Sequence, residues 1–173
     1  MYKRQVTITV EDAAGATGTQ TFTITVANTN DAPSISSTAV TAVDEDSAYS
    51  YSITTSDVDT GDSAAITCSC PSWITLTDNG DGTGTLSGTP TNDDVGSNSV
   101  TLTVTDGSSA TGTQTFDVVV TNTNDAPTIS STAVVSVDED SAYSYTTTAS
   151  DVDAGDTVTL TCTTVPTLSL IHI

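Results

Sequence analysis

The sequence predicts an all-β protein built from tandem, seven-stranded, antiparallel β-sandwiches. Three observations support this fold class. Threonine, serine and valine are abundant among the 173 residues, whereas residues that favour helices, such as leucine, lysine and glutamate, are scarce. Short segments of alternating apolar and polar residues are separated by turn-forming residues. The whole pattern also recurs after 94 residues.

The recurrence is marked by the motif Asn-Thr-Asn-Asp-Ala-Pro, which occurs at Asn28–Pro33 and again at Asn122–Pro127. Each proline lacks a backbone donor and favours an extended residue before it, so the motif interrupts strands and marks a domain boundary. Roughly two thirds of the positions related by this shift are identical, which indicates an internal repeat. We therefore expect the end of one repeat at 6–29, a complete repeat at 30–123 and the beginning of another at 124–167.

The two ends of the chain are predicted not to be native. Met1–Gln5 can be encoded by GTG TAT AAG AGA CAG, and the reverse complement of these bases encodes Leu168–His172. This DNA resembles the transposase end sequence used to prepare sequencing libraries. We therefore interpret 1–5 and 168–173 as adapter-derived and leave them out of the fold prediction.

Seven strands are expected in the complete repeat, separated by turns in the way that is typical of β-sandwiches. Alternation is clear around Tyr49 and Tyr51 and around Leu102. Asp78–Gly82 and Asp106-Gly107 are hairpin turn signals, and Trp73, Leu76, Leu86 and Phe116 are expected in the core. The expected strands are 36–43, 48–55, 63–68, 73–77, 84–87, 99–105 and 113–121; the strands on either side of the repeated motif include 21–26 and 129–137.

The charge balance limits the partners of the chain. Its net charge is −20, and without the two ends no lysine, arginine or histidine remains against 22 acidic residues. The carboxylates must then be solvated, screened by salt or bound to cations. Nucleic acid and anionic membrane surfaces are not expected as partners, because both require basic residues. No apolar run is long enough to span a membrane, so no membrane insertion is expected.

The three cysteines are expected to be small buried residues rather than a disulfide pair. Cys68 and Cys70 are two residues apart, so on a strand they would point the same way with poor disulfide geometry. Cys162 is the repeat counterpart of Cys68, and a bridge between them would join two domains.

Acidic residues gather in clusters between the predicted strands. Calcium prefers six to eight oxygen ligands from Asp, Glu, Asn and backbone carbonyls, which these clusters can supply. The alternative is a solvated acidic surface whose aspartates form local hydrogen bonds in turns. The clusters are Asp44–Asp46 with its copy Asp138–Asp140; Asp57, Asp59 and Asp62 with their copies Asp151, Asp153 and Asp156; Asn92–Asp94; and the linker residues Asn28, Asn30, Asp31, Asn122, Asn124 and Asp125.

These motifs resemble the cadherin-like and dystroglycan-type Ig-like repeats of large secreted bacterial adhesins. The resemblance covers 6–167 and depends on the Asn-Asp-Ala-Pro boundary, the Val-Asp-Glu-Asp segment, Ser-Asp-Val-Asp-x-Gly-Asp, Pro-Ser-Trp-Ile-x-Leu and Leu-Ser-Gly-Thr-Pro. It implies Ig-like/cadherin-like sandwiches with calcium between successive domains.

The resemblance also implies which residues hold the calcium. Glu45, Asp93 or Asp94 and the linker residues Asn122, Asn124 and Asp125 would face Asp151 and Asp153 of the following repeat. Asn28, Asn30 and Asp31 would likewise face Asp57 and Asp59, and Glu139 corresponds to Glu45. Thr91-Asn-Asp-Asp94 stands where cadherins have Leu-Asp-Arg-Glu, and Ala32 and Ala126 replace an Asn, so one or two ions per junction are expected.

No enzymatic activity is predicted. The only histidine is His172 in the adapter-derived end, so no Ser-His or Cys-His pair can form, and the carboxylates recur at boundaries instead of meeting in one pocket.

We expect a calcium-stiffened stalk module of a large extracellular bacterial surface protein that acts in cell adhesion. Its partners would be neighbouring repeats of the same chain, with cell-surface or polysaccharide ligands bound through other domains. The alternatives are a carbohydrate-binding or accessory module of a secreted hydrolase, for which Trp73 with Tyr49 and Tyr51 would be the stacking platform, and a passive acidic spacer without specific ion sites.

Overall fold

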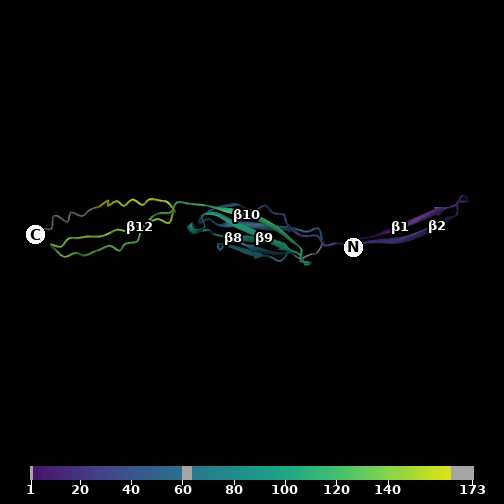
Figure 1. Cartoon of the computed structure of the whole chain (residues 1–173), viewed down its shortest axis with the longest axis horizontal. Helices are drawn as coiled ribbons and strands as arrows, with labels where there is room; N and C mark the ends of the chain where they lie inside the picture. Colours follow the sequence, from purple (N-terminus) through teal and green to yellow (C-terminus); the bar gives the residue numbers. More distant parts are fainter. Residues whose placement is uncertain (1, 60–63, 165–173) are drawn as a thin grey trace.

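A computed structural model describes residues 2–59 and 64–164. Three parts follow one another along its long axis (Figure 1). The N-terminal hairpin consists of β1 (Tyr2–Glu11) and β2 (Thr17–Val26), which pair along their full length. The central sandwich extends from Ser34 to Thr121. The C-terminal segment, 126–164, contains only β11 (Thr128–Ile129) and β12 (Ala149–Ser150) as regular strands.

The central sandwich has two four-stranded sheets, which confirms the predicted all-β sandwich fold. All strand pairs are antiparallel except β4 with β10, which is parallel. One sheet has the order β3 (Ser34–Ile35), β5 (Tyr49–Ser56), β8 (Thr83–Gly88), β7 (Ile74–Asp78); the other has the order β4 (Ala42–Asp44), β10 (Thr111–Thr121), β9 (Gly96–Thr105), β6 (Ala65–Ser69).

The core lies between the two sheets, where alternate side chains of each strand point inward. Leu86 of β8 and Leu102 of β9 are fully buried, as the alternation predicted. The ring of Tyr51 meets that of Phe116 edge to face, with the centroids 5.8 Å apart. Its hydroxyl donates to Oε1 of Gln114 at 2.9 Å, so the buried phenol also ties the two sheets together.

The predicted first strand, 36–43, is wrong as a single element. Ser36 and Ser37 both donate backbone N–H groups to the carbonyl of Thr54, which interrupts the ladder between β3 and β5. The chain then crosses to the other sheet, where Val43 in β4 pairs with Val120. An apolar alternation specifies which face a residue occupies but not which sheet supplies its neighbour, so the split was not visible in the sequence.

The prediction that Cys68 and Cys70 do not pair is also wrong, because the structure joins them in a disulfide with a Cα–Cα distance of 5.5 Å. The geometric argument assumed that both residues lie on a strand, whereas β6 ends at Ser69. Cys70 is therefore free to turn back toward Cys68. Both are half-buried against the core, whereas Cys162 is unpaired and exposed.

The C-terminal segment repeats the sequence of the first part of the central sandwich but forms shorter strands. The strand predicted at 129–137 forms only at β11, and the counterpart of β5 shortens to β12. In the central sandwich β4 pairs with β10 and β5 with β8, and among the described residues the C-terminal segment has no strands in those positions. Neighbouring strands, more than the local sequence, stabilise these elements.

Of the two predicted adapter-derived ends, Tyr2–Gln5 lies within β1, whereas Met1 and 168–173 are outside the described residues. The part of the chain that the structure describes has no helix with the length and apolar character needed to cross a membrane.

Leu86→Ala should destabilise the central sandwich by about 2–5 kcal/mol, because it leaves a cavity between the sheets. Ser87→Ala changes the neighbouring exposed position on the same strand and should alter the free energy of unfolding by less than about 0.5 kcal/mol. Urea unfolding followed by the fluorescence of Trp73, the only tryptophan, would measure both. Equal losses in the two variants would contradict the assignment of Leu86 to the core.

Candidate metal centre at the linker

The linker between the central sandwich and the C-terminal segment, 122–125, is held by hydrogen bonds to one carboxylate. Asp153 accepts the side-chain amide of Asn122 at 2.9 Å on one oxygen and the backbone N–H of Asp125 at 2.7 Å on the other. Its own backbone N–H donates to Asp151 at 3.0 Å, which closes the turn after β12. Asp153 therefore holds the beginning of the C-terminal segment against the linker.

Glu45 reaches the same linker from the central sandwich. It follows β4, and its backbone N–H donates to the carbonyl of Thr121 at 2.9 Å, which continues the parallel pairing with β10. One carboxylate oxygen accepts the backbone N–H of Thr123 at 2.6 Å. The next residue, Asp46, has a φ of 58°, in a tight turn that directs the chain back toward β5.

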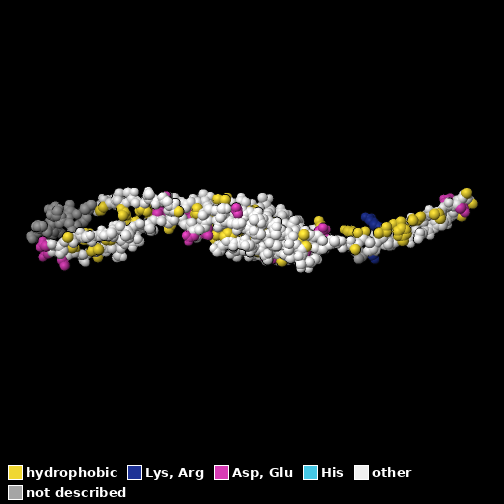
Figure 2. Space-filling model, viewed as in Figure 1, with side chains coloured by type: hydrophobic (Ala, Val, Ile, Leu, Met, Phe, Trp, Pro, Cys, Tyr) yellow, Lys and Arg dark blue, Asp and Glu magenta, His cyan; other side chains and the backbone are white. Residues whose placement is uncertain are grey.

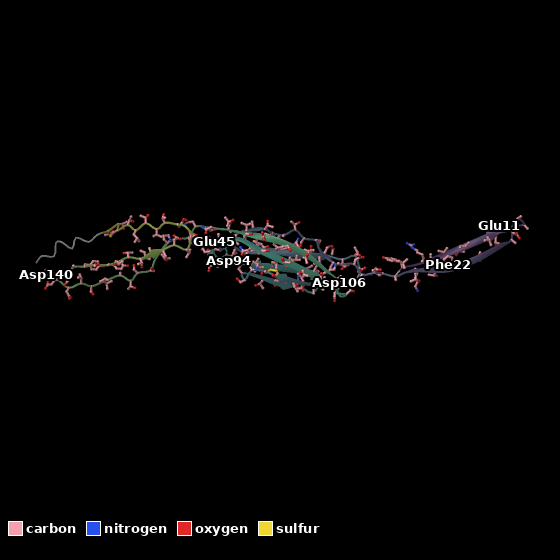
Figure 3. The ribbon with its side chains drawn as sticks, viewed as in Figure 1. Glu11, Phe22, Glu45, Asp94, Asp106 and Asp140 are labelled. Atoms are coloured by element: carbon pink, nitrogen blue, oxygen red, sulfur yellow. A yellow bond between two sulfur atoms is a disulfide. The ribbon has the colours of Figure 1, made fainter. Side chains whose placement is uncertain are left out.

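Glu45, Asp125 and Asp153 converge at this point, with one carboxylate oxygen from each lying within 4.8 Å of the others. Glu45 is only 1% exposed and Asp153 only 6% exposed. Oε2 of Glu45 is buried and has no hydrogen-bond partner. Figure 3 shows Glu45 at the end of the sandwich that faces the C-terminal segment.

This arrangement is unfavourable unless a cation is present. Two like charges 4 Å apart repel by about 4 kcal/mol at an effective dielectric constant of 20. Burying a carboxylate oxygen without a partner adds a desolvation cost of several kcal/mol. The donor set consists only of hard oxygen atoms, and the orphaned Oε2 of Glu45 points to a missing partner. Both observations fit calcium.

Other oxygen atoms surround these three. Asp151, Asp153 and Asp156 form a second, overlapping group with ligand atoms within 4.8 Å of one another. Asn92, in the short 3-10 helix η1 (Asn92–Asp94), donates its side-chain amide to Asp125 at 2.8 Å. The centre thus joins residues from the sandwich, the linker and the C-terminal segment.

The remaining residues predicted for this junction lie outside the three-carboxylate group. Asp94 accepts the backbone N–H and hydroxyl of Thr91, both at 2.9 Å, and so caps η1. Asp93 is exposed, and the amide of Asn124 donates to the backbone carbonyl of Asp125. Glu139, which was predicted as the counterpart of Glu45 and not as a ligand of this junction, is exposed in the C-terminal segment.

The first linker, 28–31, is also held by hydrogen bonds to one aspartate carboxylate. Asp59 accepts the amide of Asn28 at 2.6 Å and the backbone N–H of Asp31 at 2.7 Å, as Asp153 does from the residues 94 positions later. Asp57 accepts the backbone N–H of Asp59, and its Oδ2 is buried without a hydrogen-bond partner. Asp62 lies outside the described residues.

The sequence did not predict that Asp106 contacts the first linker. It predicted Asp106 only as a turn residue, and one carboxylate oxygen does accept the backbone N–H groups of Ser108 and Ala110. The other oxygen accepts the amide of Asn30 at 2.8 Å, across 76 residues of sequence. The repeat counterpart, Asp12, accepts the backbone N–H groups of Ala14 and Ala16 in the same kind of turn, so the recurrence of this aspartate indicated the turn and not the contact with Asn30.

The pKa values of both anchoring aspartates in the first junction are below the ordinary aspartate range. Hydrogen bonds from the backbone of Asp31 and then from Asn28 lower the pKa of Asp59. The hydrogen bond from Asn30 is the main cause of the lowered pKa of Asp106. Each bond favours the charged form of its acceptor, so both linker contacts depend on ionised carboxylates.

Trp73 does not form an open stacking surface. Its ring packs edge to face on Tyr49 with the centroids 5.5 Å apart, and its indole N–H donates to Asn98 at 3.1 Å. Burial, together with the charge of nearby Tyr51, raises the pKa of Tyr49 to about 12. These aromatic residues pack against the core, as expected if they are structural.

The fold and the linker define an Ig-like β-sandwich module with acidic junctions. Residues 32–121 match the family model described as "Putative Ig domain". The chain belongs to this family. No curated protein matches the sequence.

Several solved structures are similar to the chain. The extracellular cadherin domains 1–5 of protocadherin gamma B2 align over 88% of this chain and 32% of theirs, with 17% identity and a TM-score of 0.63, which supports the fold. An endo-fucoidan hydrolase from glycoside hydrolase family 107 matches 70% of this chain with 26% identity and a TM-score of 0.46, and the chain spans 19% of that enzyme. The SrpA adhesin from Streptococcus sanguinis matches 61% of this chain and 67% of its own, with 15% identity and a TM-score of 0.49.

The hydrogen bond from the backbone of Asp31 to Asp59 should be lost on acidification. Because the folded-state pKa of Asp59 is lowered, its contribution to stability is complete above the unfolded value of about 3.9 and disappears as the pH falls through the folded value. The amide proton shift of Asp31, followed by NMR, should therefore titrate with a midpoint below about 3.9 and should lose this titration in Asp59→Asn. A midpoint at or above the ordinary aspartate value would contradict the assignment.

Proposed function

We propose that this chain is a repeat module of a large extracellular bacterial surface protein of the adhesin type, and that it acts as a calcium-stiffened stalk without catalytic activity. The observation that carries the proposal is the convergence of Glu45, Asp125 and Asp153 at the linker. A passive acidic spacer would keep these groups apart in solvent, where their repulsion is screened.

The three carboxylates come from the three parts whose relative motion a stalk must restrict. Glu45 belongs to the sandwich, Asp125 to the linker and Asp153 to the C-terminal segment. Calcium held by these residues would supply the positive charge that offsets their mutual repulsion. The hydrogen bonds of Asp153 to the linker and of Glu45 to Thr123 orient the carboxylates before any cation binds, which reduces the entropy lost on binding.

Without a cation, the same charges weaken the junction. Repulsion among the carboxylates favours separation of the sandwich from the C-terminal segment and opposes the hydrogen bonds that hold the linker. The junction then becomes a hinge. The stiffness of the stalk would in this way depend on the calcium concentration around it.

An extracellular location is part of the proposal. The disulfide between Cys68 and Cys70 is a bond that forms and persists in oxidising environments. Calcium-binding modules outside the cell have dissociation constants of about 10⁻⁴ to 10⁻³ M, which suits the calcium concentrations found there. The net charge of −20 keeps such a molecule soluble and well hydrated.

Calcium should raise the melting temperature of the full chain. At free calcium about ten times the dissociation constant, linkage adds about 1.4 kcal/mol, which corresponds to a rise of about 5–10 °C for a domain of this size. Thermal unfolding would be measured with calcium and with chelator, both at the same high sodium chloride concentration. Glu45→Gln and Asp153→Asn should each remove most of the rise.

Asp117→Asn is the matched control, because it removes one charge from an exposed position in the middle of β10, away from the linker. It should retain the calcium response of the original chain. The proposal fails if sodium alone produces the same rise, or if Glu45→Gln and Asp117→Asn respond to calcium alike.

A further inference from the structure

We propose that Asn79 and Gly80 form a self-modifying site, where the backbone nitrogen of Gly80 attacks the side-chain amide of Asn79 and releases ammonia. The carboxylate of Asp78 is the general base for this step. All three residues belong to the complete repeat, and the inference does not rest on the proposed function.

The pair lies at the tip of a hairpin in the central sandwich. β7 ends at Asp78 and β8 begins at Thr83, so residues 79–82 connect the two strands. The backbone N–H of Asn79 donates to the carbonyl of Thr83 at 3.0 Å, which closes the turn. Asn79 and Gly80 are both exposed, so water reaches the amide.

Gly80 leaves the attacking nitrogen unobstructed. Its φ is 76°, and a Cβ atom on it would meet nothing within 4 Å beyond its neighbours in the chain. A side chain on the residue after an asparagine hinders the approach of the nitrogen to the amide carbon, and glycine has none. Every other asparagine of the chain is followed by Thr, Asp or Ser. Asn79 is therefore the asparagine at which the ring closes most easily.

The carboxylate of Asp78 contacts the nitrogen that must react. Its Oδ1 accepts the backbone N–H of Gly80 at 3.0 Å, and its Oδ2 accepts the backbone N–H of Ile66 at 3.0 Å. The second bond anchors the carboxylate to β6 and keeps the first oxygen directed at Gly80. An amide nitrogen becomes nucleophilic as it loses its proton, and a carboxylate positioned in this way can accept that proton.

The amide group that departs is held by one exposed hydrogen bond. Nδ2 of Asn79 donates to the hydroxyl oxygen of Thr83 at 2.9 Å. That hydroxyl in turn donates to Asp81 at 2.6 Å. Because both contacts are exposed, water can replace the amide as a partner when ammonia leaves, and no buried polar group is left without a partner.

The reaction is balanced without an oxidant, a reductant or a cofactor. A bond forms between the nitrogen of Gly80 and Cγ of Asn79, and the bond from Cγ to Nδ2 breaks. The proton of the Gly80 N–H passes to Asp78 and from there, directly or through water, to the departing nitrogen, which leaves as ammonia. The product is a cyclic imide. Water then opens either carbonyl of the ring and gives aspartate or isoaspartate at this position.

Both products change the hairpin. Each adds one negative charge beside Asp78 and Asp81, whose carboxylates already flank the turn. Figure 2 shows acidic side chains near both ends of the sandwich, so the new charge adds to an existing repulsion. Isoaspartate also inserts one methylene group into the backbone, which misaligns the hydrogen bond from this residue to Thr83. The change accumulates with the age of the molecule, because the hydrolysed amide does not re-form.

Incubation of the full chain at neutral pH, followed by mass spectrometry of its chymotryptic peptides, tests the inference. Deamidation should be concentrated at Asn79 and should give both aspartate and isoaspartate, with the other asparagines of the chain as internal references. Asp78→Ser should slow the reaction at least about tenfold, because it removes the general base. Asp81→Ser is the matched control, since Asp81 accepts only from Thr83 in this turn, and it should not slow the reaction.

The pH dependence separates a general base from a structural role. A reaction that depends on hydroxide accelerates in proportion to the hydroxide concentration. Carboxylates are ionised throughout the neutral range, so the rate in the folded chain should rise with pH much less steeply. Asp78→Ser, and the original chain unfolded in urea, should both show the steep dependence. The fluorescence of Trp73 would verify that the sandwich is folded in each variant.

Three results would overturn the inference. The first is deamidation of Asn79 that is no faster than that of the other asparagines. The second is an equal or faster reaction in Asp78→Ser with an unchanged pH dependence, which would mean that Asp78 only restrains the turn. The third is an equal slowing in Asp78→Ser and Asp81→Ser, which would indicate an effect of turn shape or charge instead of a base.

Discussion

The junction depends on one interaction, in which a single aspartate carboxylate accepts two hydrogen bonds from a linker. Asp153 does this for Asn122 and Asp125, and Asp59 does it for Asn28 and Asp31. Each contact fixes where the following strands begin relative to the end of the preceding ones. It also places a charged group beside the linker, where other carboxylates already lie. The contact that holds the junction together therefore also brings like charges close to one another.

At the second junction, the burial of Glu45 makes the repulsion between carboxylates less sensitive to screening by salt. Exposed carboxylates are screened by salt, but the Glu45 side chain is almost fully buried and one of its oxygens has no partner. The first junction repeats the hydrogen bonds from the linker to one aspartate carboxylate.

Much of the sandwich could be predicted from alternation and turns, because inward residues such as Leu86 and Leu102 report directly on burial. The switch of the first strand between sheets and the pairing of Cys68 with Cys70 could not, since both depend on where a strand ends in three dimensions. The resemblance to cadherin-like repeats implied which linker residues face which aspartates. It did not predict the burial of Glu45 or the contact of Asp106 with Asn30, because both arise from packing between elements that are distant in sequence.

The most direct test of the account is whether calcium restricts motion at the second junction. Spin labels would be attached to Cys162, which is free and exposed in the C-terminal segment, and to a cysteine introduced by Thr101→Cys on β9. Their distance distribution would be measured by electron–electron double resonance at low protein concentration. The account predicts a narrow distribution with calcium and a broad one with chelator, and no narrowing in Glu45→Gln. Equal widths with calcium and with chelator would contradict it.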